Sequence, residues 1–280
     1  MGLLDTVMGA LGLARPIRPK EPAPLALSRA GRARLERLPP GEELVVRAVP
    51  VEGGFLAAVD EEPPDPTTMV ELEDGLWAEP AQAERLAGLI LDYQRDGWVV
   101  RLELQVGARE TPNPDGRLYE IDRVLHQGRP AFFQRTDAAP PKLVRDLFAL
   151  EAVRSVLLRE HTLTIEREPA NPWASIDRHV DAALRAHILR GAPIVDGDRT
   201  ALREDPLEAE VVRVLEAEVL PGVHRDGGDI VLLRVREGVA YVSLRGACAS
   251  CPASVLTLKG AVERTLKRAF PQDIDKVVAE

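Results

Sequence analysis

The sequence predicts a mixed α/β fold, of the α+β kind, with three small domains joined by linkers. Short apolar runs between glycines and prolines are typical of strands, and they share the chain with apolar stripes spaced by three or four residues, which are typical of helices. Aromatic residues make up 4% of the chain and 23 residues are proline, which favours several small cores. The length of 280 residues also exceeds the ~150 residues of an ordinary single domain.

The first predicted domain covers residues 25–104 and follows a short helix and linker at 1–24. The segment LALSRAGRARLERL has helical spacing, and Pro39-Pro40-Gly41 is expected to end that helix. The remaining elements expected here are strands at 45–51, 55–59, 70–72, 89–93 and 98–104, with a hairpin turn at Gly53-Gly54 and a short helix at 80–87.

The second predicted domain covers residues 105–195, and a charged linker at 196–205 follows it. ETPNPDG at 110–116 is a turn cluster. KLVRDLFAL after Pro141 is expected to be a helix, and 153–158 and 162–166 are expected to pair as strands. The closing helix carries a one-sided apolar stripe formed by Trp173, Ile176, Val180, Leu184 and Ile188.

The third predicted domain covers residues 206–280. Asp205 is a good N-cap and Pro206 suits the first helical position, while Pro221-Gly222 is expected to end this helix. Strands are expected at 230–235 and 240–244, and a second helix at 254–270. The order helix, strand, strand, cysteine loop, helix predicts a compact α-β-β-α module.

The charge and hydropathy of the chain argue against two classes of partner. A net charge of −9 disfavours nucleic acid, whose phosphates are bound by clustered lysine and arginine. No run approaches the ~18–20 apolar residues of a membrane span, so we expect no membrane partner.

Two cysteines three residues apart, without an export signal, indicate metal or redox chemistry in a reducing compartment. We expect the cytoplasm, with an organelle left open.

Cys248 and Cys251 lie between a predicted strand and a predicted helix, in RGACASCPAS. Free N–H groups at a helix N-terminus stabilise a thiolate, the form that binds metal. Arg245, Lys259 and Arg264 are expected to offset part of its negative charge. The pair alone leaves three interpretations open: metal or cluster binding, thiol–disulfide redox chemistry, and a structural role.

The number of ligands narrows the metal interpretation. Iron–sulfur clusters are usually held by four cysteines, and tetrahedral zinc also takes four ligands, whereas this chain has two cysteines. A symmetric dimer in which each chain lends its pair is the simplest solution. Such a cluster would be exposed and shared, which suits holding and transfer.

The third domain resembles the C-terminal NFU domain of NifU-type iron–sulfur scaffold proteins. The resemblance rests on the Asp226-Gly227-Gly228-Asp229 turn, on Leu-Arg-Gly-Ala-Cys before the first cysteine, on Cys248-x-x-Cys251-Pro252 and on Thr257-Leu258-Lys259-Gly260. It implies a [4Fe–4S] cluster bound by Cys248 and Cys251, bridged between two chains of a homodimer, received from an upstream donor and handed to apo iron–sulfur proteins.

The other two domains carry weaker family marks. The second domain resembles the N-terminal domain of NFU scaffolds, and the resemblance rests on the segments ETPNP, LVRDLFALEAVRSVLL, TLTIERE and RGAPIV. It implies a role in folding or in partner recognition. The first domain resembles an A-type iron–sulfur carrier in LALSRAGRARLERL, the Gly53-Gly54 hairpin, DEEPPDP and LILDY. That family has a cysteine where Phe55 stands here, so the resemblance implies a degenerate copy used for docking clients.

The remaining candidates have structural explanations. We interpret the glycines between Asp226 and Asp229 as a backbone requirement for positive φ, rather than as part of a metal site with His224. The other histidines lack ligand spacing and are expected to be exposed: His126, His161, His179 and His187. Trp173 is expected to anchor a core.

No P-loop, nucleophile elbow or dinucleotide fingerprint is present, so we expect a carrier and not an enzyme. The alternative is a thiol–disulfide oxidoreductase that uses the same two cysteines. A thioredoxin-like fold has more sheet after its cysteine pair, whereas the sequence here predicts only one helix after Cys251.

Overall fold

The computed structural model of the protein describes residues 25–51, 54–95, 97–189, 195–196, 205–249 and 252–280. The helix expected within 1–24, most of the linker at 196–205 and Cys251 lie outside the described residues. The mixed α/β class is confirmed. The chain divides into two compact units, one containing Pro19–Gln105 with Val180–Pro193 and the other containing Val106–His179 with Ile194–Glu280. The three-domain boundaries given above stay a prediction.

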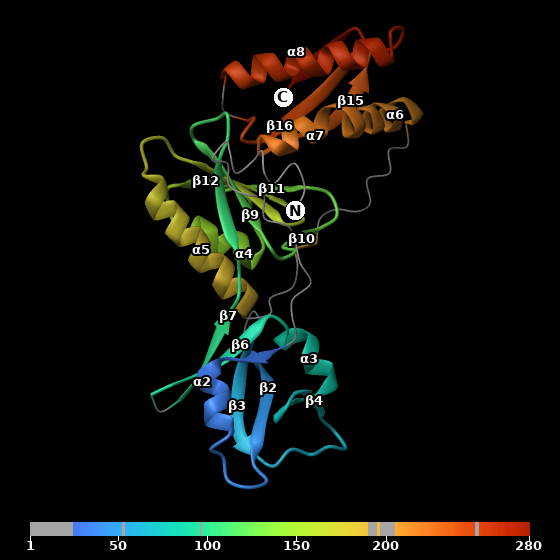
Figure 1. Ribbon diagram of the computed structural model, residues 1–280. Coiled ribbons are helices and arrows are strands. Elements are labelled where there is room, and N and C mark those ends of the chain that lie inside the picture. The colour runs from blue at the N-terminus through green and yellow to red at the C-terminus, as the bar shows by residue number, and fades with distance from the viewer. Residues whose placement is uncertain (1–24, 52–53, 96, 190–194, 197–204, 250–251) are drawn as a thin grey trace, which may run out of the picture. The chain divides into compact units, whose positions relative to one another are not determined.

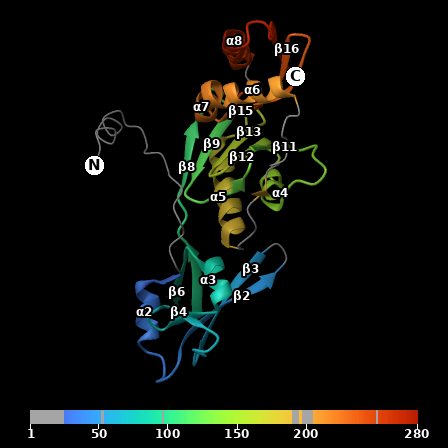
Figure 2. The same ribbon diagram turned by 90° about the vertical axis from the view of Figure 1, so that its right-hand side faces the viewer.

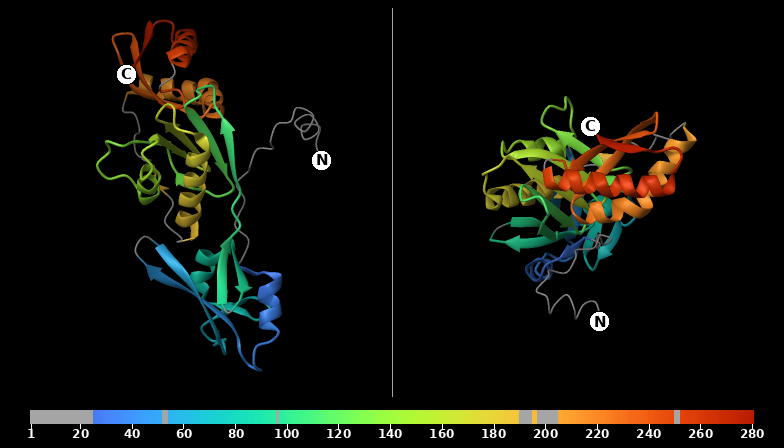
Figure 3. Two further views of the ribbon diagram at one scale, coloured as in Figure 1. Left: turned by 90° about the vertical axis from the view of Figure 1, so that its left-hand side faces the viewer. Right: turned by 90° about the horizontal axis from the view of Figure 1, so that it is seen from above.

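In its described residues, the smaller unit contains two sheets, two short helices and the second half of a long helix that begins in the larger unit (Figure 3). One sheet has the order β3-β2-β5-β4 and the other has the order β1-β6-β7. Its elements are β1 (Ala26–Leu27), α2 (Arg29–Leu35), β2 (Glu43–Val51), β3 (Gly54–Glu62), β4 (Val70–Glu73), β5 (Leu76–Ala78), α3 (Pro80–Leu86), β6 (Leu89–Gln94) and β7 (Gly97–Leu102).

The predicted hairpin of the smaller unit is confirmed, because β2 and β3 pair as antiparallel strands. The first helix is shorter than expected. Ser28 is its N-cap and its hydroxyl accepts a hydrogen bond from the Gly31 N–H at 3.0 Å, so the helix begins at Arg29. The residues just before it, Ala26–Leu27, pair with β6 as a parallel strand instead.

The larger unit contains a five-stranded sheet with the order β11-β12-β13-β9-β8 (Figure 2). The predicted pair β12–β13 is confirmed as antiparallel, whereas β8, β9 and β11 were not predicted. The elements of this part are β8 (Val106–Glu110), β9 (Gly116–Ile121), β10 (His126–Gln127), β11 (Ala131–Gln134), α4 (Lys142–Phe148), β12 (Val153–Arg159), β13 (Thr162–Arg167), α5 (Trp173–Leu189) and β14 (Val195–Asp196).

The two faces of the five-stranded sheet have different neighbours. Tyr119 on β9 lies on the face toward α5, where its hydroxyl donates to Asp177 at 2.7 Å. Strand residues alternate between faces, so Leu157 and Thr164, a cross-strand pair, point to the opposite face. There they contact the turns at Gly246 and Gly227. This second face therefore lies against the C-terminal part of the same unit.

The C-terminal module, residues 205–280, packs helices on a three-stranded sheet with the order β15-β16-β17 (Figure 1). Seen from above, α8 lies along the α6–α7 helices (Figure 3), and their apolar side chains share one core. The elements are α6 (Pro206–Val214), the π-helix η1 (Leu215–Val219), α7 (Leu220–Arg225), β15 (Gly228–Arg236), β16 (Val239–Gly246), α8 (Pro252–Ala269) and β17 (Lys276–Ala279).

Two predictions for the module were incomplete or wrong. Pro221-Gly222 does not end the helix, which continues through η1 into α7 as far as Arg225. Pro221 falls in the first turn of α7, after the π-helical turn, where a missing N–H is tolerated. The second difference is β17, a parallel partner of β16. The module is therefore α-β-β-α followed by one more strand.

Candidate functional site

The cysteine loop has the predicted setting between a strand and a helix. β16 ends at Gly246 and α8 begins at Pro252, so the loop comprises residues 247–251. Cys248 is described and is 7% exposed, within the apolar core of the module. Cys251 lies outside the described residues. Pro252 is the first residue of α8, so this helix begins two residues earlier than the predicted 254–270 helix, at a position that suits proline.

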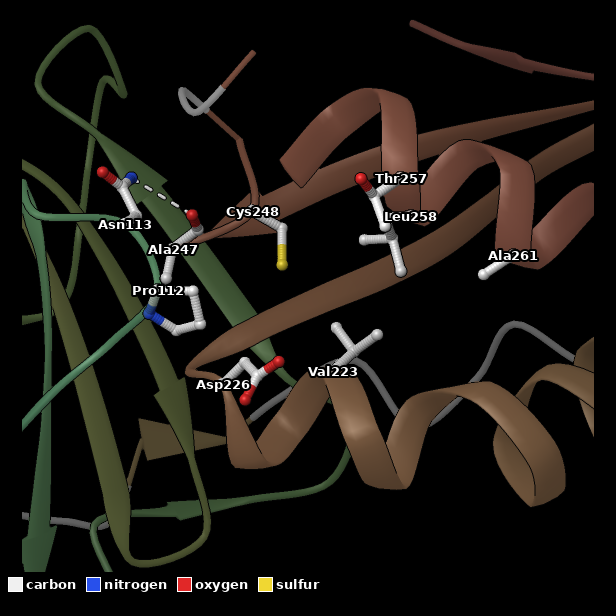
Figure 4. A pocket seen from close by; sticks show the side chains of 9 residues that line it. All are labelled: Pro112, Asn113, Val223, Asp226, Ala247, Cys248, Thr257, Leu258 and Ala261. Carbon is white, nitrogen blue, oxygen red and sulfur yellow. Dashed lines mark hydrogen bonds between the residues drawn. The ribbon is translucent and has the colours of Figure 1, made fainter. Parts of the chain in front are cut away.

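The sulfur of Cys248 points into a cavity of about 360 Å³ (Figure 4). Val223 and Asp226 of the α7 end bound this space on one side, and Leu258 of α8 bounds it on another. The full lining is Pro112, Asn113, Val223, Asp226, Ala247, Cys248, Thr257, Leu258 and Ala261. Cys248 is therefore near the surface of the module although its own exposure is small.

The turn between α7 and β15 is shaped to fit around Cys248. Gly227 has φ +78°, which confirms the prediction that this turn needs a left-handed backbone. Gly228 packs directly on the Cys248 sulfur, so a Cβ at residue 228 would overlap the Sγ atom. Next to them His224 Nε2 lies 3.0 Å from Asp229 Oδ1, and Asp229 is 2% exposed. Among the described residues, no three His, Cys, Asp or Glu side chains are grouped to hold a metal.

The cation that acts on Cys248 comes from a different part of the unit. Arg159, at the end of β12, donates a hydrogen bond to the His224 carbonyl oxygen at 2.8 Å. Burial lowers the pKa of the Arg159 guanidinium, and the negative charges of Asp229 and Cys248 oppose that shift. Arg159 is thus a positive charge close enough to Cys248 to interact with its thiolate form.

Two of the three residues expected to neutralise the loop, Arg245 and Lys259, act on other groups in the structure. The Arg245 guanidinium carbon lies 6.0 Å from the ring centre of Phe132. A hydrogen bond from Lys267 lowers the pKa of Glu263, and the charge of Lys259 adds to this effect. Arg159 was not among the predicted site residues, because nothing in the sequence around it indicates that it lies near a cysteine loop about ninety residues further along the chain.

The segment before β9 also reaches the cysteine loop. Asn113 is 3% exposed, and its side-chain amide donates a hydrogen bond to the Ala247 carbonyl oxygen at 3.1 Å (Figure 4). Pro112 lines the cavity beside Cys248. Both residues belong to the TPNP turn that the sequence analysis noted, so a signal for this turn existed, although its contact with the cysteine loop was not foreseen.

Two other predictions about single side chains were wrong. His126 is fully buried, with Nε2 2.5 Å from the Arg129 carbonyl oxygen, and His187 is 7% exposed, so these histidines are not solvent-exposed. Trp173 is half-buried rather than a core anchor. The guanidinium carbons of Arg117 and Arg167 lie 4.5 and 4.7 Å from the centre of one of its rings.

Two known families match the chain in the larger unit and in α5. Residues 211–278 match the family described as "NifU-like domain", and residues 106–191 match the one described as "Scaffold protein Nfu/NifU N terminal". None of the helices in the described ranges has both the length and the apolar character needed to span a membrane.

Curated relatives carry a shared name, "NFU1 iron-sulfur cluster scaffold homolog, mitochondrial". The Drosophila ananassae protein is 31% identical over 204 residues, which cover 66% of this chain and 71% of that protein. The Drosophila virilis protein is 29% identical over 185 residues, covering 63% of this chain. The chain spans 62% of that relative's length, less than two thirds.

Among solved structures, a solution NMR structure of a NifU-like protein from Saccharomyces cerevisiae is similar to part of this chain. It is 18% identical and has a TM-score of 0.30. The match covers 37% of this chain and 94% of that one.

Proposed function

Because the chain belongs to the Nfu family of iron–sulfur cluster scaffold proteins, we propose that it binds a [4Fe–4S] cluster through Cys248 and Cys251 and transfers it to apo-proteins. The observation that carries this proposal is the position of Cys248. Its sulfur faces a cavity between the end of α7 and the first turns of α8, next to the helix start where the second cysteine precedes Pro252.

The cluster is cargo and is shared between two chains. A cubane cluster takes about four thiolates, and one chain brings two cysteines, so two chains are needed. Cys248 and Cys251 of each chain are the proposed ligands. A homodimer that forms around its cargo comes apart when the cargo leaves, which suits delivery.

The chemistry of the site favours thiolates. Amide N–H groups at the N-terminus of a long helix stabilise nearby negative charge, and α8 follows the cysteine loop directly. Arg159 adds a positive charge close to the site, because its guanidinium donates hydrogen bonds to the His224 and Gly228 carbonyl oxygens. These groups hold the sulfur atoms ready for iron without needing any catalytic residue.

The proposed partners are an upstream cluster donor and apo iron–sulfur proteins, and the proposed role is that of a carrier and not of an enzyme. The cytoplasm stays our prediction for the compartment, although the relatives named above are called mitochondrial. A docking role for the first domain, as a degenerate A-type copy, also stays a prediction.

Anaerobic reconstitution with iron and sulfide tests the proposal. We expect brown protein, a shift from monomer to dimer in size-exclusion chromatography, and about four irons per two chains. Cys251→Ala should abolish both colour and dimer. A single chain that retains a complete cluster would contradict the shared site. Colourless protein with a readily reversible Cys248–Cys251 disulfide would favour the oxidoreductase alternative.

A further inference from the structure

The second face of the five-stranded sheet is an interaction surface for the C-terminal module. A Cβ on Gly116 would lie 3.0 Å from the Ala247 Cβ, and one on Gly227 would lie 3.0 Å from the Thr111 Cγ2. These distances are tighter than ordinary contacts, so glycine at both positions permits a close approach. Gly227 and Ala247, the module residues in these two contacts, belong to the two turns next to Cys248.

Three side chains of the 106–179 segment donate hydrogen bonds to backbone carbonyls at the end of α7 and in the cysteine loop, and we call them the clasp: Arg109, Asn113 and Arg159. Asn113 donates to the Ala247 carbonyl at 3.1 Å. Arg159 donates to the His224 carbonyl and Arg109 to the Arg225 carbonyl, both at 2.8 Å. Each bond contributes modestly, and together they hold the segment over the cysteine loop.

The clasp has a direct effect on Cys248. In this arrangement Cys248 is 7% exposed, with Gly228 against its sulfur and Pro112 at the cavity beside it. A cluster shared by two chains requires the ligand sulfur of each chain to reach the surface where the chains meet. Pro112 and Asn113 of the 106–179 segment line the cavity into which the Cys248 sulfur points, so a second copy would compete with the clasp for this side of the module.

We propose that the 106–179 segment is a reversible cover of the cysteine loop, and that the clasp must open before two chains load a shared cluster. The inference rests on the proposed function for its loading step. The protection of Cys248 by the segment exists in the chain without a cluster, so it is measured independently of cluster loading.

The first experiment measures how fast iodoacetamide alkylates Cys248 in the full chain without cargo. The parent carries Cys251→Ser, so that only Cys248 reacts. A buried thiol is alkylated only when the protein transiently opens and exposes it, so the alkylation rate is proportional to the population of that open state. Loss of one hydrogen bond should raise this population about five- to tenfold. We therefore expect Asn113→Ala and Arg109→Gln to be alkylated about five- to tenfold faster than the parent.

Matched controls guard against a general loss of folding. Arg109 is exposed, so Arg109→Gln should fold normally even if a substitution of the half-buried Arg159 or the buried Asn113 does not. Arg145→Gln is the control, because Arg145 donates to the Pro140 carbonyl within its own segment at 3.0 Å. It should react at the parental rate. Equal rates in Arg109→Gln, Asn113→Ala and the parent, or a parent as reactive as the urea-unfolded chain, would overturn the cover.

The second experiment uses Arg109→Gln with both cysteines present, in the anaerobic reconstitution described above. The cover predicts faster colour and faster dimer formation than in the unsubstituted chain, with the same final iron content. If the variant is alkylated faster but neither chain takes up iron, the proposed function fails and the cover stands. If both chains load at one rate and are alkylated at one rate, the cover fails and the proposed function stands.

Discussion

Gly228 lies directly against the sulfur of Cys248, with no room for a Cβ between them. Gly228→Ala should therefore push the Cys248 side chain or the turn out of place. We expect the free energy of unfolding to fall by about 1–3 kcal/mol, the usual cost of overpacking a buried site. Thermal unfolding of the apoprotein measures this. Gly222→Ala is the control, because a Cβ there meets no atom within 4 Å, and it should be neutral. Equal stability of the two variants would contradict the packing described.

Among the charges that raise the pKa of Arg159, that of Asp229 has the largest effect, and the Asp229 carboxylate also lies 3.0 Å from His224 Nε2. Asp229→Asn should leave the Arg159 charge less compensated, so we expect a loss of about 1–3 kcal/mol in urea unfolding. Asp226→Asn, at an exposed site two residues from Gly228, should change stability by less than about 0.5 kcal/mol. Parental stability of Asp229→Asn would show that Asp229 does not hold this turn.

The N-cap of α6 gives a third prediction. The Asp205 carboxylate accepts hydrogen bonds from the N–H groups of Leu207 and Glu208, at 2.8 and 3.3 Å. Asp205→Ala should cost about 1 kcal/mol, whereas Asp205→Asn keeps an acceptor and should cost only a few tenths. Differential scanning calorimetry of both variants measures this difference. The interpretation of Asp205 as a cap would be wrong if both variants melted at the parental temperature.

Tyr119 makes stability depend on alkaline pH. Burial raises the pKa of its hydroxyl, and the hydrogen bond to Asp177 raises this pKa further. In the unfolded chain a tyrosine loses its proton near pH ~10. Because the folded pKa is the higher one, the stabilisation is complete below pH ~10 and decreases as pH rises beyond it.

The corresponding variant is Tyr119→Phe, with urea unfolding measured at about pH 9 and about pH 11. The variant loses the hydrogen bond to Asp177 at every pH, so the slopes and not the absolute values are compared. We expect the free energy of unfolding to fall less steeply with pH in the variant. Identical slopes would mean that Tyr119 does not contribute to this dependence.

The sequence predicted those helices and strands that can be recognised from a few consecutive residues. Alternating apolar residues marked β12, β13, β15 and β16, and Pro252 after the cysteine pair marked the start of α8. β17 was missed because its four residues pair with β16 only after α8 has brought them back along the chain. Strands β8 and β9 were missed because polar and charged residues interrupt them.

The site could be predicted only in the part that lies within one segment. The cysteine motif and the Asp226–Asp229 turn are each a short local segment, and the need of Gly227 for a positive φ follows from its residue type. The hydrogen bond from Arg159 to the His224 carbonyl joins the end of β12 to the end of α7, two elements that are far apart in the sequence. Such a contact depends on how those elements pack, and no residue spacing indicates it.

The small exposure of Cys248 has a consequence for the chain while it carries no cargo. Oxidation of a cysteine to sulfenic acid and beyond requires a peroxide to reach the sulfur, and susceptibility follows exposure. A thiol that is 7% exposed is sterically shielded from such attack. Under the function proposed above, this shielding keeps the Cys248 thiol reduced, and so able to bind iron, while the chain holds no cluster.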